Sequence, residues 1–376
     1  MTIYVVKRGD TLWNLGRRFG TDPGELARIN QLSDPSRLPV GLALVVPSPG
    51  PSPKLAIDVN GFAYPGIGTE TLSETLPSLT FLSPFSWRAA QDGTLLPIDD
   101  QRLVTAAYAG AAAPILTAAN ISGAGFSSDI AHAVLTDEKA QERFTESLLA
   151  ALKGRNYYGA NLDFEYVYPF DRESYNQFIA RLGEKLHALG YYFITTLAPK
   201  ESDGQPGLLY EAHDYAAHGK YADRVIIMTY EWGYTYSPPQ AVSPADRIRR
   251  VLSYAVTRIP PGKILMGFSN YGYSWSLPWR QGDAARVISN AGAADLAASV
   301  YAEIKYDEKS AAPHFNYTDA GGARREVWFE DARSARARLA LAGEFGLSGI
   351  SVWTINRLYR PWIAVLESMY GVEKII

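Results

Sequence analysis

From residue 55 onward, short apolar runs alternate with helical patterns along the chain. Such runs are typical of strands that are covered on both faces, as in a parallel sheet. Helical patterns fill the gaps, for example at 137–153 and at 173–189, where Leu189-Gly190 provides a C-terminal glycine. Eight strands are predicted in this way, at 55–62, 79–86, 114–121, 159–166, 191–198, 224–231, 263–271 and 348–355.

Eight strand–helix units over about 320 residues predict an α/β fold, a (β/α)8 TIM barrel. A small insertion is expected between strands seven and eight, because 312–317 and 326–329 have strand patterns on either side of a turn at 319–322. The alternative is an open doubly wound sheet. It would be expected to carry a glycine-rich phosphate loop after an early strand, and the sequence has none there.

The first 47 residues predict a separate small unit with the order β-α-α-β. Strand patterns at 2–6 and 42–47 enclose two helical patterns, and Asp10 or Thr11 can cap the first helix. Alternating proline and small residues follow at 48–54, a composition typical of a semi-rigid linker. We therefore divide the chain into 1–47, a linker at 48–54 and the barrel at 55–376.

The predicted fourth strand carries the most unusual polar pattern. Asn161, Asp163 and Glu165 alternate with apolar residues, which places their side chains on one face. An Asp-x-Glu pair on an exposed edge strand would be ordinary, but this strand is predicted to be covered. Two neighbouring carboxyl groups repel each other's charge, so that one keeps its proton while the other ionises, as acid-catalysed sugar chemistry requires.

Other predicted strands end in polar and aromatic residues, and functional groups of such barrels gather at these ends. Any one of these side chains alone would more often belong to the core. Together they form a candidate substrate-binding set at the ends of strands six, seven and eight: Met228, Tyr230, Glu231, Trp232, Asn270, Tyr271 and Trp353.

Composition narrows the function classes. The 376 residues include 47% hydrophobic and 12% aromatic residues and carry a net charge of -3, which provides no basic footprint for nucleic acid or an anionic membrane. The longest uncharged run, 103–128, is interrupted by Pro114 and Asn120 and predicts barrel elements, not a membrane span. The chain has no cysteine, its five histidines are scattered, and we expect no metal and no cofactor. No secretory signal is visible at the start.

The fourth-strand motif, Gly159-x-Asn161-Leu162-Asp163-Phe164-Glu165, resembles the signature of glycoside hydrolase family 18, the chitinase-like barrels. Met228-x-Tyr230-Glu231 and Val352-Trp353 resemble the family's marks on strands six and eight, and the resemblance spans most of 55–370. The chain departs from the pattern at Tyr158 and Asn161, where the family usually has acidic residues, and at Glu231, where Asp is common.

This resemblance implies roles for individual residues. Glu165 is expected to be the general acid and base, and Asp163 to orient the substrate's acetamido group, whose oxygen is the nucleophile. Tyr230 is expected to bind that oxygen. Asn161 can then act on Asp163 only through a hydrogen bond, Glu231 would hold the sugar, and Trp353 would form the floor under the reacting ring.

The N-terminal unit resembles a lysin motif (LysM). The resemblance is carried by Tyr4-x-Val6, Gly9-Asp10-Thr11-Leu12-Trp13, Leu26-x-x-Ile29-Asn30 and Val45-Val46-Pro47. It implies binding of glycans that contain N-acetylglucosamine, peptidoglycan or chitin. The matching positions are Gly9, Asp10, Thr11, Leu12, Asn30, Gln31 and Leu32.

Together the two regions resemble the spore-cortex N-acetylglucosaminidases of endospore-forming bacteria. The expected function is a retaining β-N-acetylglucosaminidase that acts on peptidoglycan, associated with the spore coat, the cortex or the cell wall. Two alternatives stay open, a chitinase and a glycan-binding barrel without activity. Retention of Glu165, Asp163 and Tyr230 together favours an enzyme.

Overall fold

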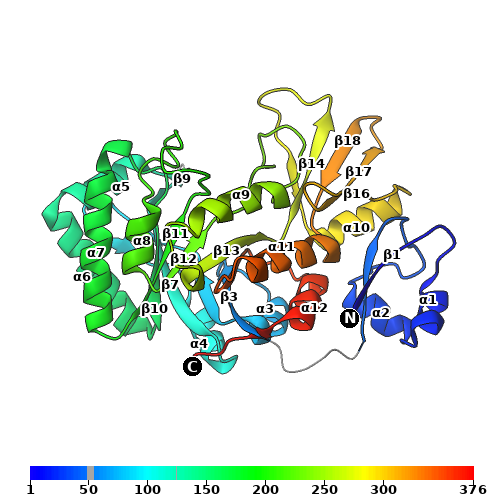
Figure 1. The fold of residues 1–376 in the computed structure, drawn as a ribbon, viewed down its shortest axis with the longest axis horizontal. Helices are drawn as coiled ribbons and strands as arrows, with labels where there is room; N and C mark the ends of the chain where they lie inside the picture. Colours follow the sequence, from blue (N-terminus) through cyan, green and yellow to red (C-terminus); the bar gives the residue numbers. More distant parts are fainter. Residues whose placement is uncertain (49–54, 124) are drawn as a thin grey trace.

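The computed structural model describes residues 1–48, 55–123 and 125–376. Of the predicted linker at 48–54, all but Ser48 lies outside the described residues. The chain forms a β/α barrel in the centre, an antiparallel sheet standing above one side of it, and the N-terminal unit at one end (Figure 1).

Eight parallel strands close the barrel, and the closing pair is the last strand against the first. All eight strands predicted from the sequence are confirmed, with boundaries that shift by a few residues. In barrel order the strands are β3 (Ala56–Ala63), β4 (Phe81–Pro84), β7 (Ala113–Ala119), β10 (Gly159–Asp163), β11 (Tyr192–Leu197), β12 (Arg224–Ile227), β13 (Ile264–Ser269) and β19 (Gly349–Trp353).

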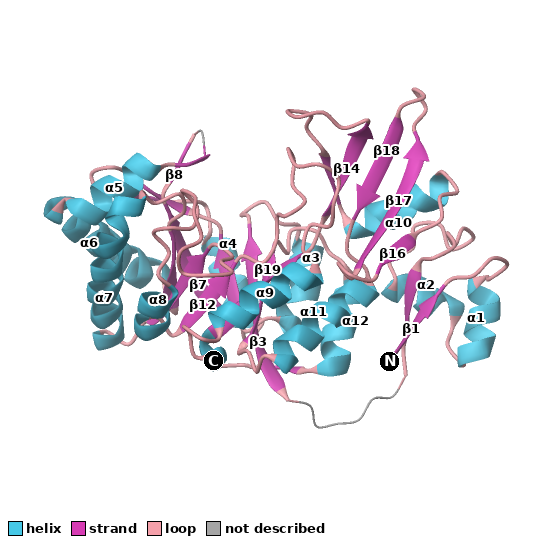
Figure 2. Cartoon of the chain, turned by 45° about the horizontal axis from the view of Figure 1, so that its top comes forward, coloured by secondary structure: helices cyan, strands magenta, loops and turns pink. Residues whose placement is uncertain are grey.

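Helices surround these strands, as Figure 2 shows. They are α3 (Thr69–Thr75), α4 (Gln101–Ala109), α5 (Ser128–Thr136), α6 (Glu138–Arg155), α7 (Arg172–Ala188), α8 (Tyr215–Tyr221), α9 (Ala245–Ala255), α11 (Ala332–Glu344) and α12 (Arg360–Met369). Short 3-10 turns lie at η1 (Leu76–Ser78), η2 (Pro169–Asp171) and η3 (Pro261–Lys263). Short strands at the barrel's ends are β5 (Trp87–Ala89), β6 (Leu95–Leu96), β8 (Ile121–Ser122), β9 (Gly125–Phe126) and β20 (Gly371–Val372).

Local sequence explains where the longest helix begins and ends. Asp137 precedes α6, and its carboxylate accepts hydrogen bonds from the backbone amides of Lys139 and Ala140 at 2.8 and 3.0 Å. Asn156 ends the helix in the left-handed conformation. Amphipathic helices such as this one bury their apolar stripe against the strands, while Phe62, Phe81 and other side chains fill the barrel's interior.

The insertion between β13 and α11 is larger than the predicted hairpin. The hairpin is present, but it belongs to a five-stranded antiparallel sheet that also carries a helix. Its elements are β14 (Gly272–Leu277), β15 (Arg286–Ile288), α10 (Asn290–Ser299), β16 (Lys305–Asp307), β17 (Ala312–Thr318) and β18 (Arg324–Trp328).

The N-terminal unit has the predicted β-α-α-β order: β1 (Thr2–Val5), α1 (Leu12–Phe19), α2 (Pro23–Ile29) and β2 (Ala43–Val46). Its core is continuous with the insertion, because Leu26 and Leu44 belong to the same buried cluster as Ala293 and Ala297 of α10. The amide of Ile304 also donates to the carbonyl of residue 40 at 2.8 Å. The unit is thus packed firmly against the rest of the molecule.

Candidate active site

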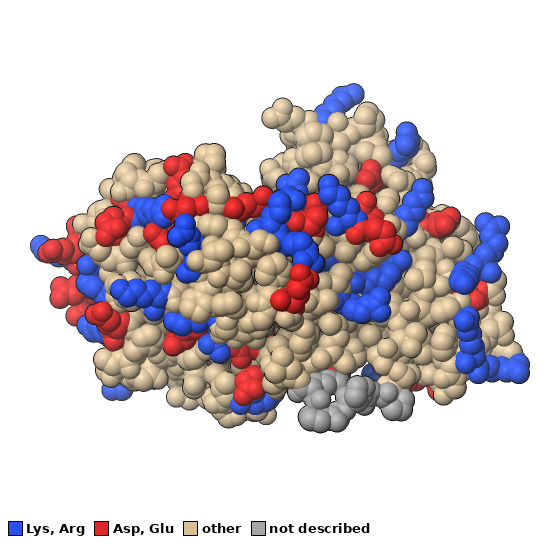
Figure 3. Space-filling model, in the orientation of Figure 1, with Lys and Arg blue, Asp and Glu red and all other residues tan. Residues whose placement is uncertain are grey.

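A cavity of about 600 Å³ opens at the carboxyl ends of the barrel strands, where such folds hold their functional groups. We call it the strand-end cavity. In the space-filling view, the surface is hollowed between the insertion and the opposite side of the barrel (Figure 3). The structure brings seven of the predicted residues together in its lining: Asp163, Glu165, Met228, Tyr230, Glu231, Trp232 and Trp353.

The two carboxyl groups of the strand-four motif share this cavity. Burial raises the pKa of Asp163 to about 7. The pKa of Glu165 is raised well above its ordinary value, first by burial and then by the negative charges of Asp163 and Glu231. Glu165 therefore keeps its proton at a pH where an exposed glutamic acid has lost it, so it can serve as a proton donor.

Glu165 lies just beyond the end of β10, and a buried amide fixes its backbone there. The side chain of Asn120 accepts from the Glu165 amide at 2.9 Å and donates to the Glu165 carbonyl at 2.8 Å. Asn120 also donates to the carbonyl of Ser127 and is fully buried. Asn120 could not be recognised from the sequence, since a single asparagine after a strand forms no motif.

Asn161 does not line the cavity. Its side chain is fully buried inside the barrel, and its oxygen accepts from the Thr196 hydroxyl at 3.0 Å. Its amide nitrogen and one oxygen of Asp163 have no hydrogen-bond partner among the described residues. Buried polar atoms without partners are costly, and each one calls for an explanation such as a ligand or an ordered water. Asn161 thus belongs beneath the cavity, not in its wall.

Glu231 is held by two tyrosines of the insertion. Its carboxylate accepts from the hydroxyls of Tyr271 and Tyr273 at 2.5 and 3.0 Å, and its backbone has a positive φ of 64°. Tyr271 was predicted from the sequence and Tyr273 was not, although it follows in the same strand pattern. The nearby hydroxyl of Tyr230 is almost buried, and its pKa is raised well above the ordinary value by burial, so it remains a hydrogen-bond donor.

Trp353 is fixed by three other aromatic rings. The rings of Phe62, Tyr64 and Phe85 meet it edge to face, at centroid distances of 5.4, 5.9 and 4.7 Å. These contacts orient the indole at the end of β19, where it also lines the strand-end cavity beside Met228. The arrangement is suited to be a rigid apolar floor.

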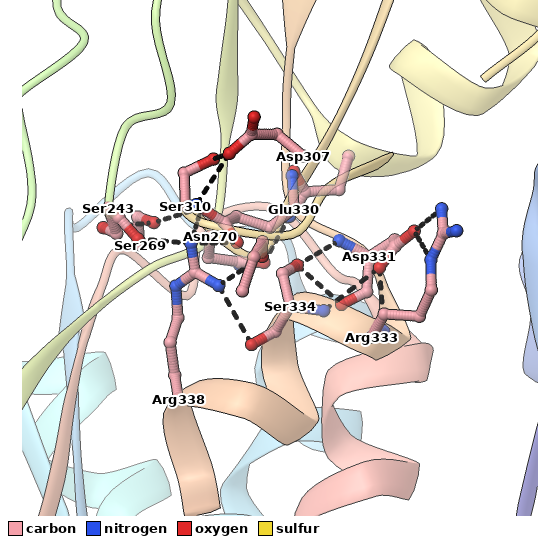
Figure 4. Close-up of polar contacts among 12 residues, drawn as sticks. Ser243, Ser269, Asn270, Asp307, Ser310, Glu330, Asp331, Arg333, Ser334 and Arg338 are labelled. Carbon is pink, nitrogen blue, oxygen red and sulfur yellow. Dashed lines mark hydrogen bonds and ion pairs between the residues drawn. The ribbon is translucent and has the colours of Figure 1, made fainter. Parts of the chain in front are cut away.

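Asn270 follows β13 at the predicted strand end and lines a cavity of about 330 Å³ that shares Glu231 and Trp353 with the strand-end cavity, but its side-chain amide is bonded by the protein. It is buried, and its amide donates to the carbonyls of Thr354 and Arg357 at 3.0 and 2.8 Å. It therefore holds the loop after β19. Figure 4 shows Asn270 beside a buried polar cluster in which Arg338 pairs with Glu330 at the junction of barrel and insertion.

The predicted glycan-binding residues of the N-terminal unit have structural contacts. The carboxylate of Asp10 accepts from the Tyr4 hydroxyl and the Lys7 amide, and Thr11 caps α1. Leu12 and Asn30 are buried, and the Asn30 side chain exchanges hydrogen bonds with the backbone of Val45.

The remaining members of that set lie at turns and interfaces. Gly9 has a φ of 90°, a conformation that favours glycine. Gln31 reaches the barrel, accepting from the Arg360 amide at 2.6 Å and donating to the Leu358 carbonyl at 3.2 Å. Leu32 lines a cavity of about 420 Å³ that the N-terminal unit shares with α10.

Two further observations concern the described part of the chain. It holds no group of three or more His, Asp or Glu side chains that could bind a metal ion. None of its helices has the length and apolar character needed to cross a membrane.

The family model of glycosyl hydrolases family 18 matches residues 109–357, which include the strands from β7 to β19 and the insertion. The chain belongs to glycoside hydrolase family 18. It is therefore a glycosidase, and the matched residues include Asp163 and Glu165, the paired carboxyl groups of the strand-end cavity. The LysM domain model matches residues 4–47, the N-terminal unit.

Other proteins are similar to this chain over all or most of its length. The chain is 40% identical over 430 residues to the cortical fragment-lytic enzyme of Bacillus subtilis (strain 168). The alignment covers 100% of this chain and 99% of that protein. The chain resembles the crystal structure of the spore cortex-lytic enzyme SleL of Bacillus megaterium QM B1551 with a TM-score of 0.94 and 31% identity, covering 100% and 99%. A chitinase structure from Chromobacterium violaceum ATCC 12472 matches with a TM-score of 0.77 and 28% identity, covering 84% of this chain and 99% of the chitinase.

Proposed function

We propose that this chain is a retaining β-N-acetylglucosaminidase that hydrolyses N-acetylglucosaminyl bonds in peptidoglycan by substrate-assisted catalysis. One observation carries the proposal: Glu165, Asp163 and Tyr230 line a single cavity whose floor is Trp353. These groups can donate a proton, stabilise a positive charge and hold an acetamido oxygen at the same sugar. We also propose the division into a glycan-binding unit at 1–47, a linker at 48–54 and a catalytic barrel at 55–376.

The proposed reaction begins with Glu165, whose raised pKa keeps the proton available. It protonates the glycosidic oxygen while the substrate's acetamido oxygen attacks the anomeric carbon, and the bond to the leaving sugar breaks. This places the chain among the exceptions to the scheme in which an enzyme carboxylate is the nucleophile. Because the nucleophile is part of the substrate, much of the entropic barrier is removed.

Asp163 and Tyr230 act on the intermediate. The ionised Asp163 stabilises the positive oxazolinium ion, and the Tyr230 hydroxyl donates to the acetamido oxygen and orients it. Glu165, now ionised, removes a proton from water, and that water attacks the anomeric carbon. The oxazolinium ring opens, the acetamido group is restored, and the product keeps the configuration of the substrate.

Peptidoglycan is favoured over chitin by the extent of the similarities. The two cortex-lytic relatives align with the whole chain, whereas the chitinase structure covers 84% of it. The N-terminal unit matches LysM, a module suited to N-acetylglucosamine-containing glycans of the wall. We therefore place the protein at the bacterial cell wall, and more specifically at the spore cortex or coat.

The test is to digest purified spore cortex and chitin side by side with the wild-type protein and to identify the new reducing ends by mass spectrometry. The proposal expects N-acetylglucosamine at the new ends of cortex fragments, with faster release than from chitin. Faster release from chitin would favour a chitinase, and no new ends from either polymer would favour a glycan-binding barrel. Inhibition by a thiazoline analogue of N-acetylglucosamine is also expected, and insensitivity to it would reject substrate assistance.

A further inference from the structure

The hydrogen-bond ladder between β10 and β11 stops just below the strand-end cavity. The last residue of β10 that pairs with β11 is Leu162. At the start of the ladder the Tyr192 amide donates to the Tyr158 carbonyl at 3.3 Å, and bonds in this direction recur at every second residue of a parallel pair. Continued in the same phase, the ladder would next join the Ala198 amide to the Phe164 carbonyl.

The imidazole of His213 stands between these two groups. The Ala198 amide donates to Nδ1 at 2.9 Å, and Nε2 lies 2.9 Å from the Phe164 carbonyl oxygen. Because Nδ1 accepts from an amide, the neutral ring carries its hydrogen on Nε2 and donates it to Phe164. Two bonds across a ring thus replace one direct bond between strands. The ends of β10 and β11 are held apart by an imidazole at the level of the paired carboxyl groups.

The surroundings of His213 suit a spacer without charge. The residue is 1% exposed, and burial lowers the pKa of its imidazole to about 4, so the ring is neutral from pH 5 upward. The Lys200 ammonium donates to the His213 carbonyl at 3.0 Å. The rings of Tyr175 and His218 lie at centroid distances of 6.2 Å from the imidazole. Protein groups from α7, α8 and the loop after β11 therefore fix the ring.

The carbonyl that His213 bonds belongs to the peptide group between the paired carboxyl residues. Phe164 lies between Asp163 and Glu165, and its carbonyl shares a peptide group with the Glu165 amide. His213 bonds this group from the β11 side, and Asn120 bonds it at 2.9 Å from the β7 side. Rotation of a peptide group changes the direction in which the next side chain leaves the backbone. The two bonds therefore fix Glu165 relative to Asp163.

We propose that His213 is a positioning residue, a neutral spacer that fixes the peptide group between Asp163 and Glu165 so that both carboxyl groups meet the same sugar. The inference rests on the roles proposed above for these two groups. His213 itself is buried and lies outside the lining of the strand-end cavity. A misplacement of reacting groups by about 1 Å can lower a rate about a hundred-fold. The effect of His213 is therefore expected in kcat and not in KM.

Two substitutions separate the two hydrogen bonds of His213. In His213→Gln the side-chain amide reaches the position of Nε2 and keeps a donor for Phe164. In His213→Asn the side-chain oxygen takes the position of Nδ1, and the donor to Phe164 is lost. His218→Asn is the matched control, because His218 is a buried histidine of α8 whose ring nitrogens have no hydrogen-bond partner among the described residues. Steady-state kinetics and thermal melting are measured for all variants on soluble peptidoglycan fragments and on an N-acetylglucosamine tetrasaccharide.

His213→Asn is expected to lower kcat roughly thirty-fold and to leave KM within about two-fold of the wild type. His213→Gln should keep kcat within about three-fold, even if both variants melt at a similarly lowered temperature. His218→Asn should change the melting temperature without a loss of kcat. A kcat of His213→Asn that is no lower than that of His213→Gln overturns the inference and leaves the proposed function standing.

The wild type provides a second measurement, which decides if His213→Asn does not fold. With ¹⁵N-labelled histidine, the His213 ring should carry hydrogen on Nε2 and none on Nδ1 from pH 5 to pH 8. Hydrogen on Nδ1, or a ring that titrates in this range, overturns the inference. A wild-type protein that cleaves neither substrate, nor purified cortex, rejects the proposed function and this inference with it.

Discussion

The strand-end cavity and the N-terminal unit were both predicted to bind glycans, yet the structure treats their polar groups in opposite ways. In the cavity, Asp163 retains an oxygen without a partner, and no protein hydrogen bond engages the Glu165 carboxyl group in the described structure. In the N-terminal unit, the polar side chains of Asp10, Thr11 and Asn30 are all bonded within the unit.

The difference teaches how a motif should be interpreted. A motif residue can be required for ligand binding or for folding, and the residue type alone does not distinguish these two roles. A buried carboxyl group with a raised pKa is unfavourable for the fold alone, so a ligand is the simpler reason for it. A capping threonine already has a sufficient reason in the helix that it begins. Substitutions of carboxyl groups in the cavity and of the capping threonine in the N-terminal unit can test this difference.

The largest effect is expected for Glu165→Gln. The amide cannot donate an acidic proton, so kcat should fall at least about a thousand-fold. The folded structure and glycan binding should persist, because the Glu165 side chain supports no contact of the fold. Release of reducing ends measures kcat, and thermal melting measures whether the variant is folded. Glu211→Gln is the control for loss of a carboxylate outside the Asp163–Glu165 pair. Turnover near the wild-type level would remove Glu165 from the proposed role.

Asp163→Asn should lower kcat about a hundred-fold and also change the pH dependence. The charge of Asp163 helps to raise the pKa of Glu165. Without that charge the pKa of Glu165 falls, so the general acid is lost at a lower pH. The alkaline limb of kcat/KM against pH should therefore move to lower pH. An alkaline limb that stays in place would show that Glu165 does not sense this neighbour.

The same substitution should stabilise the fold. The folded pKa of Asp163 is about 7, against 3.8 as the ordinary value, so folding of the wild type becomes less favourable as pH rises between these values. The amide introduced by Asp163→Asn does not titrate, so the variant should gain roughly 2–4 kcal/mol relative to the wild type at pH 8 and little at pH 4. Melting curves at the two pH values test this, and an equal difference at both would contradict it.

Asn120→Ala should have an intermediate effect. It removes both hydrogen bonds that hold the backbone of Glu165, so kcat should fall about ten-fold while KM changes little. Buried backbone groups left unpaired should cost roughly 2–3 kcal/mol of unfolding free energy. Asn120→Asp keeps the acceptor and loses the donor, and it should restore part of kcat. A loss of stability without any loss of kcat would limit Asn120 to a structural role.

The smallest effect is expected in the N-terminal unit. Thr11→Ala removes the cap of α1 and should cost about 1 kcal/mol. Ser289→Ala removes the corresponding cap of α10 and is the matched control. If Thr11 acts only as a cap, retention on insoluble peptidoglycan should change less than about two-fold for both variants. A clear loss of retention for Thr11→Ala alone would establish a ligand contact.

The barrel could be predicted because each strand is an apolar run and each helix has a helical spacing of apolar residues that ends at a recognisable residue. The extent of the insertion could not, because 272–277 and 286–288 are short and the helix at 290–299 is mostly alanine and small residues. The structure explains these small side chains, because the N-terminal unit packs against them.

The residues that line the candidate site could be predicted where they are neighbours in sequence, as in Asp163-x-Glu165 and Tyr230-Glu231. The roles of residues could not be predicted where the bonded partner is distant. Asn120 bonds a residue 45 positions away, and Asn270 bonds a loop more than 80 positions away. Strand-end position placed Asn270 near the site, but only its hydrogen bonds show that its amide faces the loop after β19.

Gly41 carries a consequence for how the two ends of the molecule cooperate. It has a φ of 87°, and a methyl group there would overlap the carbonyl oxygen of Ile304 in the insertion. One added carbon atom at this position would therefore force the N-terminal unit and the insertion apart. Because the contact leaves no room for even a methyl group, it holds the N-terminal unit at a fixed orientation relative to the barrel, and any polymer bound to both would have to follow that orientation.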